Sequence, residues 1–510
     1  MQRKILVVLS FTLILLLAFG GIAIADTPGN GGAWVTGFFV TNKDADQATV
    51  SMQFYQENNG TSLPASPITK QIAGNDTVFY FLPGNADFDG NLLADGEYSL
   101  VLSSDRAINA VANSTSTGGG LGSDINSTTS FDGMSGDSSA SNATAQKLFA
   151  PNIYSNFFGF TTNFYLQNAS SSNTTANIKY FDANGNEIVS IAENNVNIPA
   201  GSFIKRDQLG QSAIAQNTVG SATFECTTSN CKLAGVVNIT AGSGIGTANY
   251  VMYGAGSQVA YAPVVLNNYF AFISSINIQN NGVGDVEVEI EFSDGTTVNV
   301  TDTTNDGKGS LLGEGQAWSV FLPNVSGLAS GNTNGALAAT VRIVSPDSDD
   351  SIVVLANTSR TSDRAFASYN GVPLGAANVY APASNALAFG GFQFFTSITC
   401  QNLSSTATDL RYTFNGVYTN SGNAAVSGVS GTMSSIAGAP TTLAQGGSYV
   451  LLLNVTSVQS TLGLNSAGGF NGATTVEATA AGAEIACVVN QNRATAGLPG
   501  DNLGSYTSRP

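Results

Sequence analysis

The feature that most constrains the fold of this chain is an internal repeat that occurs four times. An aromatic-Ala-Pro motif stands at residues 149–151, 261–263 and 380–382, so its prolines are 112 and 119 residues apart, and Pro28 lies 123 residues before the first of them. Each copy continues into an aromatic-rich segment that ends in an asparagine. A repeat of this length corresponds to a small domain, because the repeats of solenoid proteins are only ~20–45 residues long.

The matched positions of the four copies predict β-strands. Counting back from the terminal asparagine, every copy has an aromatic residue at the eighth position, a hydroxyl at the sixth, and apolar residues at the fourth and second. Because these positions share one parity, they mark a strand with one buried face. A second strand near the end of each copy also ends in asparagine. We expect these asparagines to cap turns by bonding their own backbone, with ligand contact as the alternative. The first set, at the end of the first strand of each copy, is Asn42, Asn168, Asn280 and Asn402. The second set, at the end of the second strand, is Asn113, Asn238, Asn357 and Asn490.

Each copy contains about seven short strand patterns separated by turn signals, without a convincing helix. This predicts an all-β chain of four tandem Ig-like antiparallel β-sandwich domains. The short Ala-Pro linkers predict beads on a string, a rod on the order of 140 Å long if modules of roughly 35 Å follow one another in line. The predicted boundaries are 1–25 for a signal peptide, 26–113 for module 1, 114–146 for a Ser/Thr/Gly-rich flexible loop or linker, 147–259 for module 2, 260–378 for module 3 and 379–510 for module 4.

The N-terminal segment has the layout of a secretory signal peptide. Arg3 and Lys4 precede an apolar run over residues 5–25, which ends in the small-x-small sequence Ala23-Ile24-Ala25. The alternative is an uncleaved membrane anchor, since the run is just long enough to span a bilayer. The segment predicts an extracellular or cell-surface location, with membrane contact only through this segment if it is retained.

The arrangement of an aromatic-Ala-Pro motif, an aromatic strand ending in asparagine and a closing Val-Val-Asn strand resembles tandem Ig-like or fibronectin-III-like modules of secreted and surface-attached bacterial proteins. The resemblance covers nearly all of the chain after the signal segment, and it implies fold and location rather than an activity. The core tryptophan between two cysteines that marks Ig domains is not reproduced, because neither Trp34 nor Trp318 lies in module 4, which holds the matching cysteine pair.

Four cysteines in an exported chain predict two disulfides. Cys226 and Cys231 bracket a four-residue loop between two strands. A metal pair is the weaker alternative there, since no other soft ligand is at hand. Cys400 and Cys487 fall on core-facing positions of the first and penultimate strands of module 4. We expect each pair to form a bond.

Two acidic loops are candidates for calcium, the one cofactor that the sequence suggests. The first resembles the opening half of a calcium loop, with oxygen-bearing side chains at alternate positions, although the acid expected at its twelfth position is displaced. Its residues are Asn85, Asp87, Asp89, Asn91 and Asp95. The second is an inter-strand loop of module 3 that contains Asp347, Asp349 and Asp350. Glycine-containing β-turns and solvated loops are the alternative interpretation.

The composition of the chain argues against two classes of function. The chain has no histidine, which excludes imidazole-based catalysis, and its net charge of −17 argues against nucleic acid as a partner. We expect a non-enzymatic extracellular structural or adhesive protein, as a surface-layer, stalk or filament component. The alternative is a secreted array of carbohydrate- or polymer-binding modules, and the second alternative is a carboxylate-based glycoside hydrolase. The expected partners are a second copy, through exposed strand edges, or a cell-envelope polymer.

Overall fold

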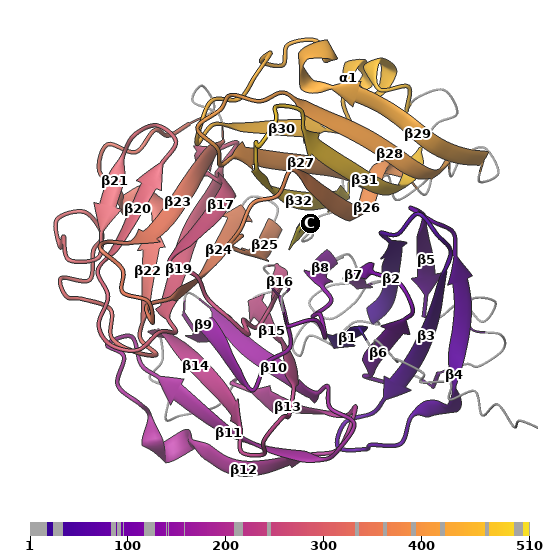
Figure 1. The fold of residues 1–510 in the computed structure, drawn as a ribbon. Helices are drawn as coiled ribbons and strands as arrows, with labels where there is room; N and C mark the ends of the chain where they lie inside the picture. The colour runs from indigo at the N-terminus through magenta and orange to yellow at the C-terminus, as the bar shows by residue number, and fades with distance from the viewer. Residues whose placement is uncertain are drawn as a thin grey trace, which may run out of the picture.

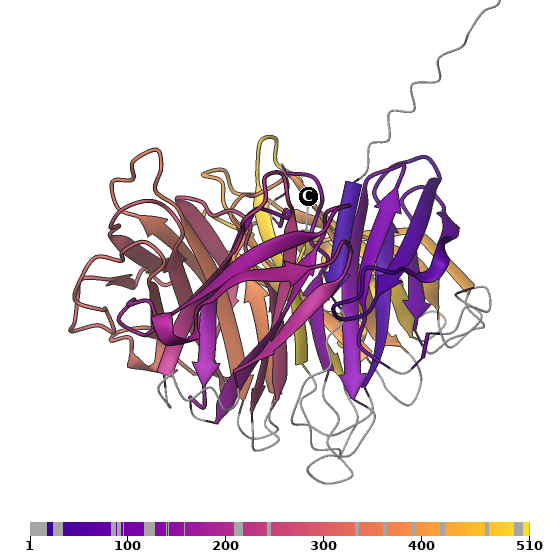
Figure 2. The same ribbon diagram turned by 90° about the horizontal axis from the view of Figure 1, so that it is seen from below.

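The structure is a computed structural model. It describes residues 18–23, 34–82, 88, 93–94, 96–116, 128–138, 140, 142–157, 159–208, 218–241, 246–331, 336–360, 365–388, 394–418, 424–464, 469–493 and 503–508. The predicted all-β class with tandem β-sandwiches is confirmed, since antiparallel sheets make up nearly all regular structure of the described residues. The four modules stand around a common centre and close a ring (Figure 1), which Figure 2 shows from the side.

Each module pairs an outer sheet with an axial sheet whose last strand reaches the centre of the ring. In module 1 the outer sheet has the order β1 (Ala18–Ala23), β6 (Ser99–Ser104), β3 (Ala48–Tyr55), β4 (Leu63–Ile72), and the axial sheet β5 (Thr77–Phe81), β2 (Trp34–Asn42), β7 (Ile108–Ser116), β8 (Thr128–Asp132). In module 2 the outer sheet is β9 (Lys147–Ser155), β14 (Thr218–Cys226), β11 (Thr174–Phe181), β12 (Glu193–Ile198), and the axial sheet β13 (Phe203–Asp207), β10 (Phe160–Asn168), β15 (Leu233–Ala241), β16 (Thr247–Val251).

Modules 3 and 4 follow the same plan with small additions. The outer sheet of module 3 is β17 (Val259–Val265), β23 (Leu337–Ile343), β20 (Val288–Phe292), β21 (Thr297–Asn299), and its axial sheet is β18 (Asn267–Tyr269), β19 (Phe272–Asn280), β24 (Ile352–Arg360), β25 (Ala365–Asn370), with β22 (Ala317–Phe321) beside β19. In module 4, β26 (Asn378–Ala388) pairs with both β31 (Phe470–Ala478) and β27 (Phe394–Asn402), which joins the two sheets. The remaining strands are β28 (Leu410–Tyr418), β29 (Ala424–Thr432), β30 (Ser448–Leu452), β32 (Ile485–Arg493) and β33 (Leu503–Thr507), and a short helix α1 (Thr456–Thr461) follows β30.

The hydrophobic pattern explains why the two kinds of sheet differ. Outer strands such as β3 alternate between buried and half-buried residues, so one face packs on the core and the other meets solvent. The axial strands β8, β16, β25 and β33 are buried at every residue. Each has an aromatic residue at the equivalent position, namely Phe131, Tyr250, Tyr369 and Tyr506.

The axial strands close the ring. β8 packs beside β16, β16 beside β25, β25 beside β33, and β33 beside β8. The space that they enclose is too narrow for a water molecule, so the described part of the axis is packed. Gly504 of β33 permits the last contact, because a Cβ there would lie 2.5 Å from Ser130 Oγ of β8.

The first strand of each module forms a joint with the next module. β1 packs against β10 and β15, β9 against β19 and β24, β17 against β27 and β32, and β26 against β2 and β7. The last of these contacts joins module 4 to module 1. The prediction of four modules in line is therefore wrong: the Ala-Pro segments lie within the first strands, which bury their surface between two modules and curve the chain into a ring.

Two segments form strands that the sequence did not predict. Residues 128–132, placed by the sequence in the flexible segment 114–146, form the axial strand β8, and Ala145 bridges to Leu233 of module 2. Residues 18–23, placed in the signal peptide, form β1 and pair with β6 over six residues. The rest of the predicted signal segment lies outside the described residues. No helix in the described part of the chain is long and apolar enough to cross a membrane.

Candidate functional site

The first set of repeat-equivalent asparagines forms one structure four times. Each is completely buried, and its amide nitrogen donates to the carbonyl four residues later and to a carbonyl of the turn before the next strand of the axial sheet. In module 2, Asn168 Nδ2 lies 2.8 Å from Ser172 O and 2.9 Å from Ile198 O, while Asn168 Oδ1 accepts from the Ser170 N–H at 2.9 Å. These side chains cap turns and have no spare atom for a ligand. The other members are Asn42, Asn280 and Asn402.

The second set of asparagines faces the axial strands. Asn238 accepts from the amide of Asn249, and the carbonyl oxygens of Asn357 and Asn490 accept from Ser368 and Ser505. Asn113 stands opposite Ser130 in the same register. These polar pairs lie between buried strands and fix their register.

Hydrogen bonds between modules surround the axis. Between modules 1 and 4, the Thr507 hydroxyl donates to Asp132 Oδ2 at 2.8 Å, and the Ser130 hydroxyl donates to Gln491 Oε1 at 3.1 Å. Three of the axial aromatic residues carry a hydroxyl that donates to a carbonyl of the first strand of their own module. The pairs are Tyr250 with Asn152, Tyr369 with Val264, and Tyr506 with Ala383. Burial raises the pKa of all three phenols.

The structure contains both predicted disulfides, and the described residues leave no cysteine free. Cys226–Cys231 closes the loop after β14, and Cys400–Cys487 links β27 to β32 in the core of module 4. Two cross-links in the described fold indicate a protein that is not cytoplasmic.

Of the two calcium candidates, only the second falls within the described residues. Asn85, Asp87, Asp89, Asn91 and Asp95 lie outside the described residues. In the loop with Asp347, Asp349 and Asp350, the Asp350 carboxylate accepts from the Asp347 N–H at 2.8 Å. Among the described residues, no three acidic or cysteine side chains gather as metal ligands would.

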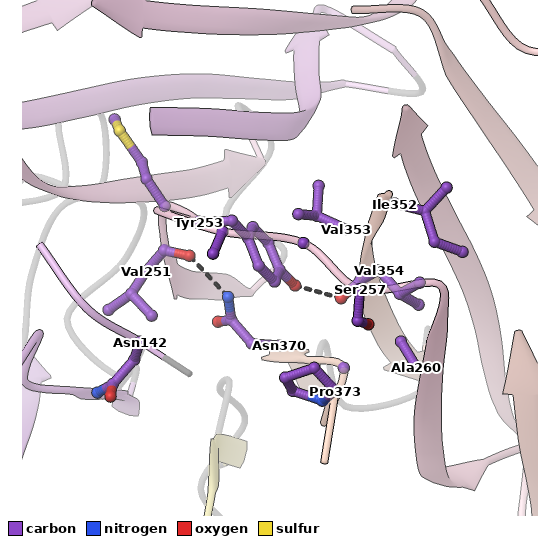
Figure 3. A pocket seen from close by; sticks show the side chains of 14 residues that line it. Asn142, Val251, Tyr253, Ser257, Ala260, Ile352, Val353, Val354, Asn370 and Pro373 are labelled. Carbon is purple, nitrogen blue, oxygen red and sulfur yellow. Dashed lines mark hydrogen bonds between the residues drawn. The ribbon is translucent and has the colours of Figure 1, made fainter. Parts of the chain in front are cut away.

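A small cavity lies between modules 2 and 3, where the chain passes from β16 to β17 (Figure 3). Asn370 Nδ2 donates to Val251 O at 2.8 Å across it, and the Tyr253 hydroxyl donates to Val354 O. Its volume of about 10 Å³ is about that of one water probe. We interpret it as a packing gap in a joint.

A large cleft lies in the joint between modules 1 and 4, with a volume of about 1130 Å³. Module 1 contributes the ends of β2 and β5 and the turn between β4 and β5. Module 4 contributes alternate residues of two paired strands, Thr413, Asn415 and Val417 of β28 and Asn471, Ala473 and Thr475 of β31. Since alternate residues share a face, the cleft lies on the outer sheet of module 4 where it faces module 1.

The joint between modules 4 and 1 differs from the others in its connectivity. In the joints after modules 1 and 2, Ser99 and Ser221 each donate to a glycine carbonyl of the next module at 2.8 Å. Alanine occupies the equivalent place in both other modules, as Ala338 of module 3 and Ala473 of module 4, so neither of their joints has this bond. The joint between modules 4 and 1 is set apart by its connectivity, because its two modules are not consecutive in the chain.

The cleft offers aromatic, amide and hydroxyl groups with little charge. Phe39 and Phe79 pack with tilted rings at 4.7 Å between ring centroids, and Phe79 is half-buried. Asn471 is 8% exposed, and its side-chain oxygen has no hydrogen-bond partner. Asp76 is the one carboxylate among the described lining residues. Such a lining suits a neutral ligand that carries hydroxyl or amide groups.

No sequence pattern predicted this cleft, because its residues come from modules that lie at opposite ends of the chain. Phe79, Asn415 and Asn471 belong to no motif and differ from the residues at equivalent positions of other modules.

Comparisons with known proteins identify no relative. No protein-family model matches the chain, and no curated protein matches it. Solved structures that the search returned include a Streptomyces avermitilis α-L-rhamnosidase complexed with L-rhamnose, at a TM-score of 0.11 and 7% identity, covering 89% of this chain and 55% of that one. An E. coli alpha-2-macroglobulin follows at a TM-score of 0.10 and 9% identity, covering 96% of this chain and 40% of that one. The chain thus spans about half or less of either structure, and these similarities carry no argument.

Proposed function

We propose that this protein is a non-enzymatic extracellular structural or adhesive protein, a component of a surface layer, stalk or filament. The observation that carries this proposal is the closed ring. Contacts of β26 with β2 and β7 join module 4 to module 1, as first strands join consecutive modules, so the molecule has a fixed shape suited to repeated assembly. The two disulfides and the predicted export segment support an extracellular setting.

Repeated apolar positions on the ring support assembly. Phe81, Phe321 and Leu452 occupy equivalent places at the ends of β5, β22 and β30, and they are 38%, 44% and 40% exposed. Equivalent positions of equivalent modules are related around the ring axis, so these side chains offer the same contact at several points. Exposed apolar groups in a regular arrangement favour association between copies.

Electron microscopy of the cell surface, with and without the protein, tests the structural role. We expect a surface layer, stalk or filament that disappears when the protein is absent. Purified protein with Phe81, Phe321 and Leu452 replaced by Ser should lose assembly and keep its fold. An unchanged surface, with free monomer in the medium, would contradict the proposal.

Carbohydrate or polymer binding is the second candidate, favoured by the cleft between modules 1 and 4. One carboxylate among its described lining residues favours binding over glycoside hydrolysis, which uses two. Titration with a panel of neutral oligosaccharides, followed by calorimetry, tests it. Phe79→Ala and Asn471→Ala should each weaken binding tenfold or more, whereas Phe321→Ala, far from the cleft, should not. Equal affinities in all three variants would exclude the cleft as the site.

A further inference from the structure

We propose that the edge of strand β6 in module 1 is a strand-acceptor site, which binds an extended, uncharged apolar strand of a separate polypeptide once export has removed residues 1–25. The inference rests on the proposed export of the chain. It concerns an interaction surface that the proposed structural role does not require.

The comparison between modules defines the site. In modules 2, 3 and 4 the strands β9, β17 and β26 cover the edges of β14, β23 and β31. The strand in this place in module 1 is β1, paired with β6 from Ala18↔Ser104 to Ala23↔Ser99. Cleavage after Ala25 would remove all of β1 and leave the backbone groups of β6 on this side unpaired.

The sequence after the cleavage point is poorly suited to replace β1. Residues 26–33 read Asp-Thr-Pro-Gly-Asn-Gly-Gly-Ala, and β2 begins at Trp34. Three glycines among these eight residues disfavour a strand. The aromatic-Ala-Pro motif found within β9, β17 and β26 is missing from this stretch.

A second, independent departure from the repeat occurs at the axis. The hydroxyls of Tyr250, Tyr369 and Tyr506 each bond to a carbonyl of the first strand of their own module. Module 1 has Phe131 at this position, which has no hydroxyl to donate. Module 1 therefore lacks the group that ties its own first strand to the axis, as expected for a strand that is not a permanent part of it.

The chemistry of the occupant follows from the strands that fill the equivalent places. β17 reads Val-Ala-Tyr-Ala-Pro-Val-Val without a charge, and β9 buries Leu148 and Ile153 completely or almost so. The β6 edge presents Leu100 and Leu102, both buried in the core of module 1. An incoming strand would gain backbone hydrogen bonds to β6 and bury apolar side chains in the joint with module 2, as in β-strand addition.

The test compares a chain that begins at Asp26 with one that retains residues 18–25. The probe is a fluorescent peptide with the sequence of residues 148–155, which omits the charged Lys147. We expect the shorter chain to bind the peptide and to melt at a higher temperature with it, and the longer chain, whose site is filled, to bind at least tenfold more weakly. A control peptide with Leu148→Asp and Ile153→Asp should not bind, because it would bury charge.

Three results would overturn the proposal. The first is equal melting temperatures for the two chains without peptide binding, which would mean that residues 26–33 fill the site. The second is polymerisation of the shorter chain alone, which would make a second copy the occupant. The third is an N-terminal sequence of the exported protein that retains residues 18–23. Each leaves the test of the cell-surface role unaffected, so the two proposals fail separately.

Discussion

At the scale of single residues, the repeat is explained by hydrogen bonds that polar side chains make to their own backbone. The four asparagines at the ends of β2, β10, β19 and β27 satisfy the same three backbone groups in each module. A buried side chain that satisfies several backbone groups is costly to remove, because those groups lose their partners without gaining water. This accounts for the recurrence of the asparagine in otherwise divergent modules.

The loss of stability on removing this side chain can be measured at Asn168. Asn168→Ala should lower the free energy of unfolding by at least about 3 kcal/mol, since it leaves two carbonyls and one N–H unsatisfied in a buried turn. Chemical denaturation checks this value. Ser171→Ala, at an exposed position of the same turn, serves as the control and should change stability by no more than about 0.5 kcal/mol. Similar stabilities for the two variants would show that the cap is dispensable.

At the scale of elements, the two disulfides differ in the length of chain that they close. Cys400 and Cys487 are 87 residues apart, and Cys226 and Cys231 are 5 apart. A longer loop loses more freedom in the unfolded state when it is cross-linked. The bond within the core of module 4 should therefore contribute more stability than the one at the surface loop.

Replacing each pair by alanine tests this expectation. Loss of Cys400–Cys487 should cost about 4–5 kcal/mol, and loss of Cys226–Cys231 about 2 kcal/mol, on the loop-entropy estimate. Calorimetry of the two double variants gives the comparison. The reverse order, with the short loop costing more, would contradict the expectation.

The axial strands are the elements that the sequence placed least well. Residues 128–132 were assigned to a flexible segment because they are surrounded by Ser, Thr and Gly, yet they are fully buried at the axis. Small polar residues suit this place, since four strands approach one another closely there. A composition typical of a linker can thus mark a tightly packed centre when the packing partners come from other modules.

The buried tyrosines predict an alkaline transition of this centre. Burial raises the pKa of Tyr154, Tyr250, Tyr369, Tyr412 and Tyr506 above the usual value of about 10. Above that pH the folded protein keeps phenol protons that the unfolded chain releases, so stability is complete below about pH 10 and falls as the pH rises.

Absorbance titration of phenolate, with circular dichroism in parallel, follows this transition. The exposed tyrosines should ionise near pH 10, and the buried ones in a later cooperative step that coincides with loss of structure. Tyr506→Phe should reduce the amplitude of the later step by one phenol. Ionisation of every tyrosine near pH 10 with unchanged dichroism would contradict the burial.

At the scale of the whole molecule, ring closure is the property to test. Small-angle X-ray scattering should give a radius of gyration near the ~23 Å of a compact chain of this length. Four modules in line, on the order of 140 Å, would give about 40 Å. A value near the larger figure would mean that module 4 does not meet module 1 in solution.

The sequence by itself determined the all-β class, the repeated sandwich, the cysteine pairs and the turn asparagines. All of these depend on local information: period-2 alternation, turn chemistry and the parity of positions within one module. Each module carries enough of this pattern to specify its own strands. The same reasoning places Cys400 opposite Cys487 without knowledge of any other module.

Only the tertiary structure decided the ring, the axial strands, the cleft between modules 1 and 4 and the acceptor edge of β6. Each depends on which surfaces of different modules meet, and residues hundreds of positions apart, such as Asp132 and Thr507, make those contacts. Burial of surface between modules stabilises these contacts, and such burial produces no periodic pattern in the sequence. The physical reason is that a strand pattern reports which face of a strand is buried, but not which module covers it.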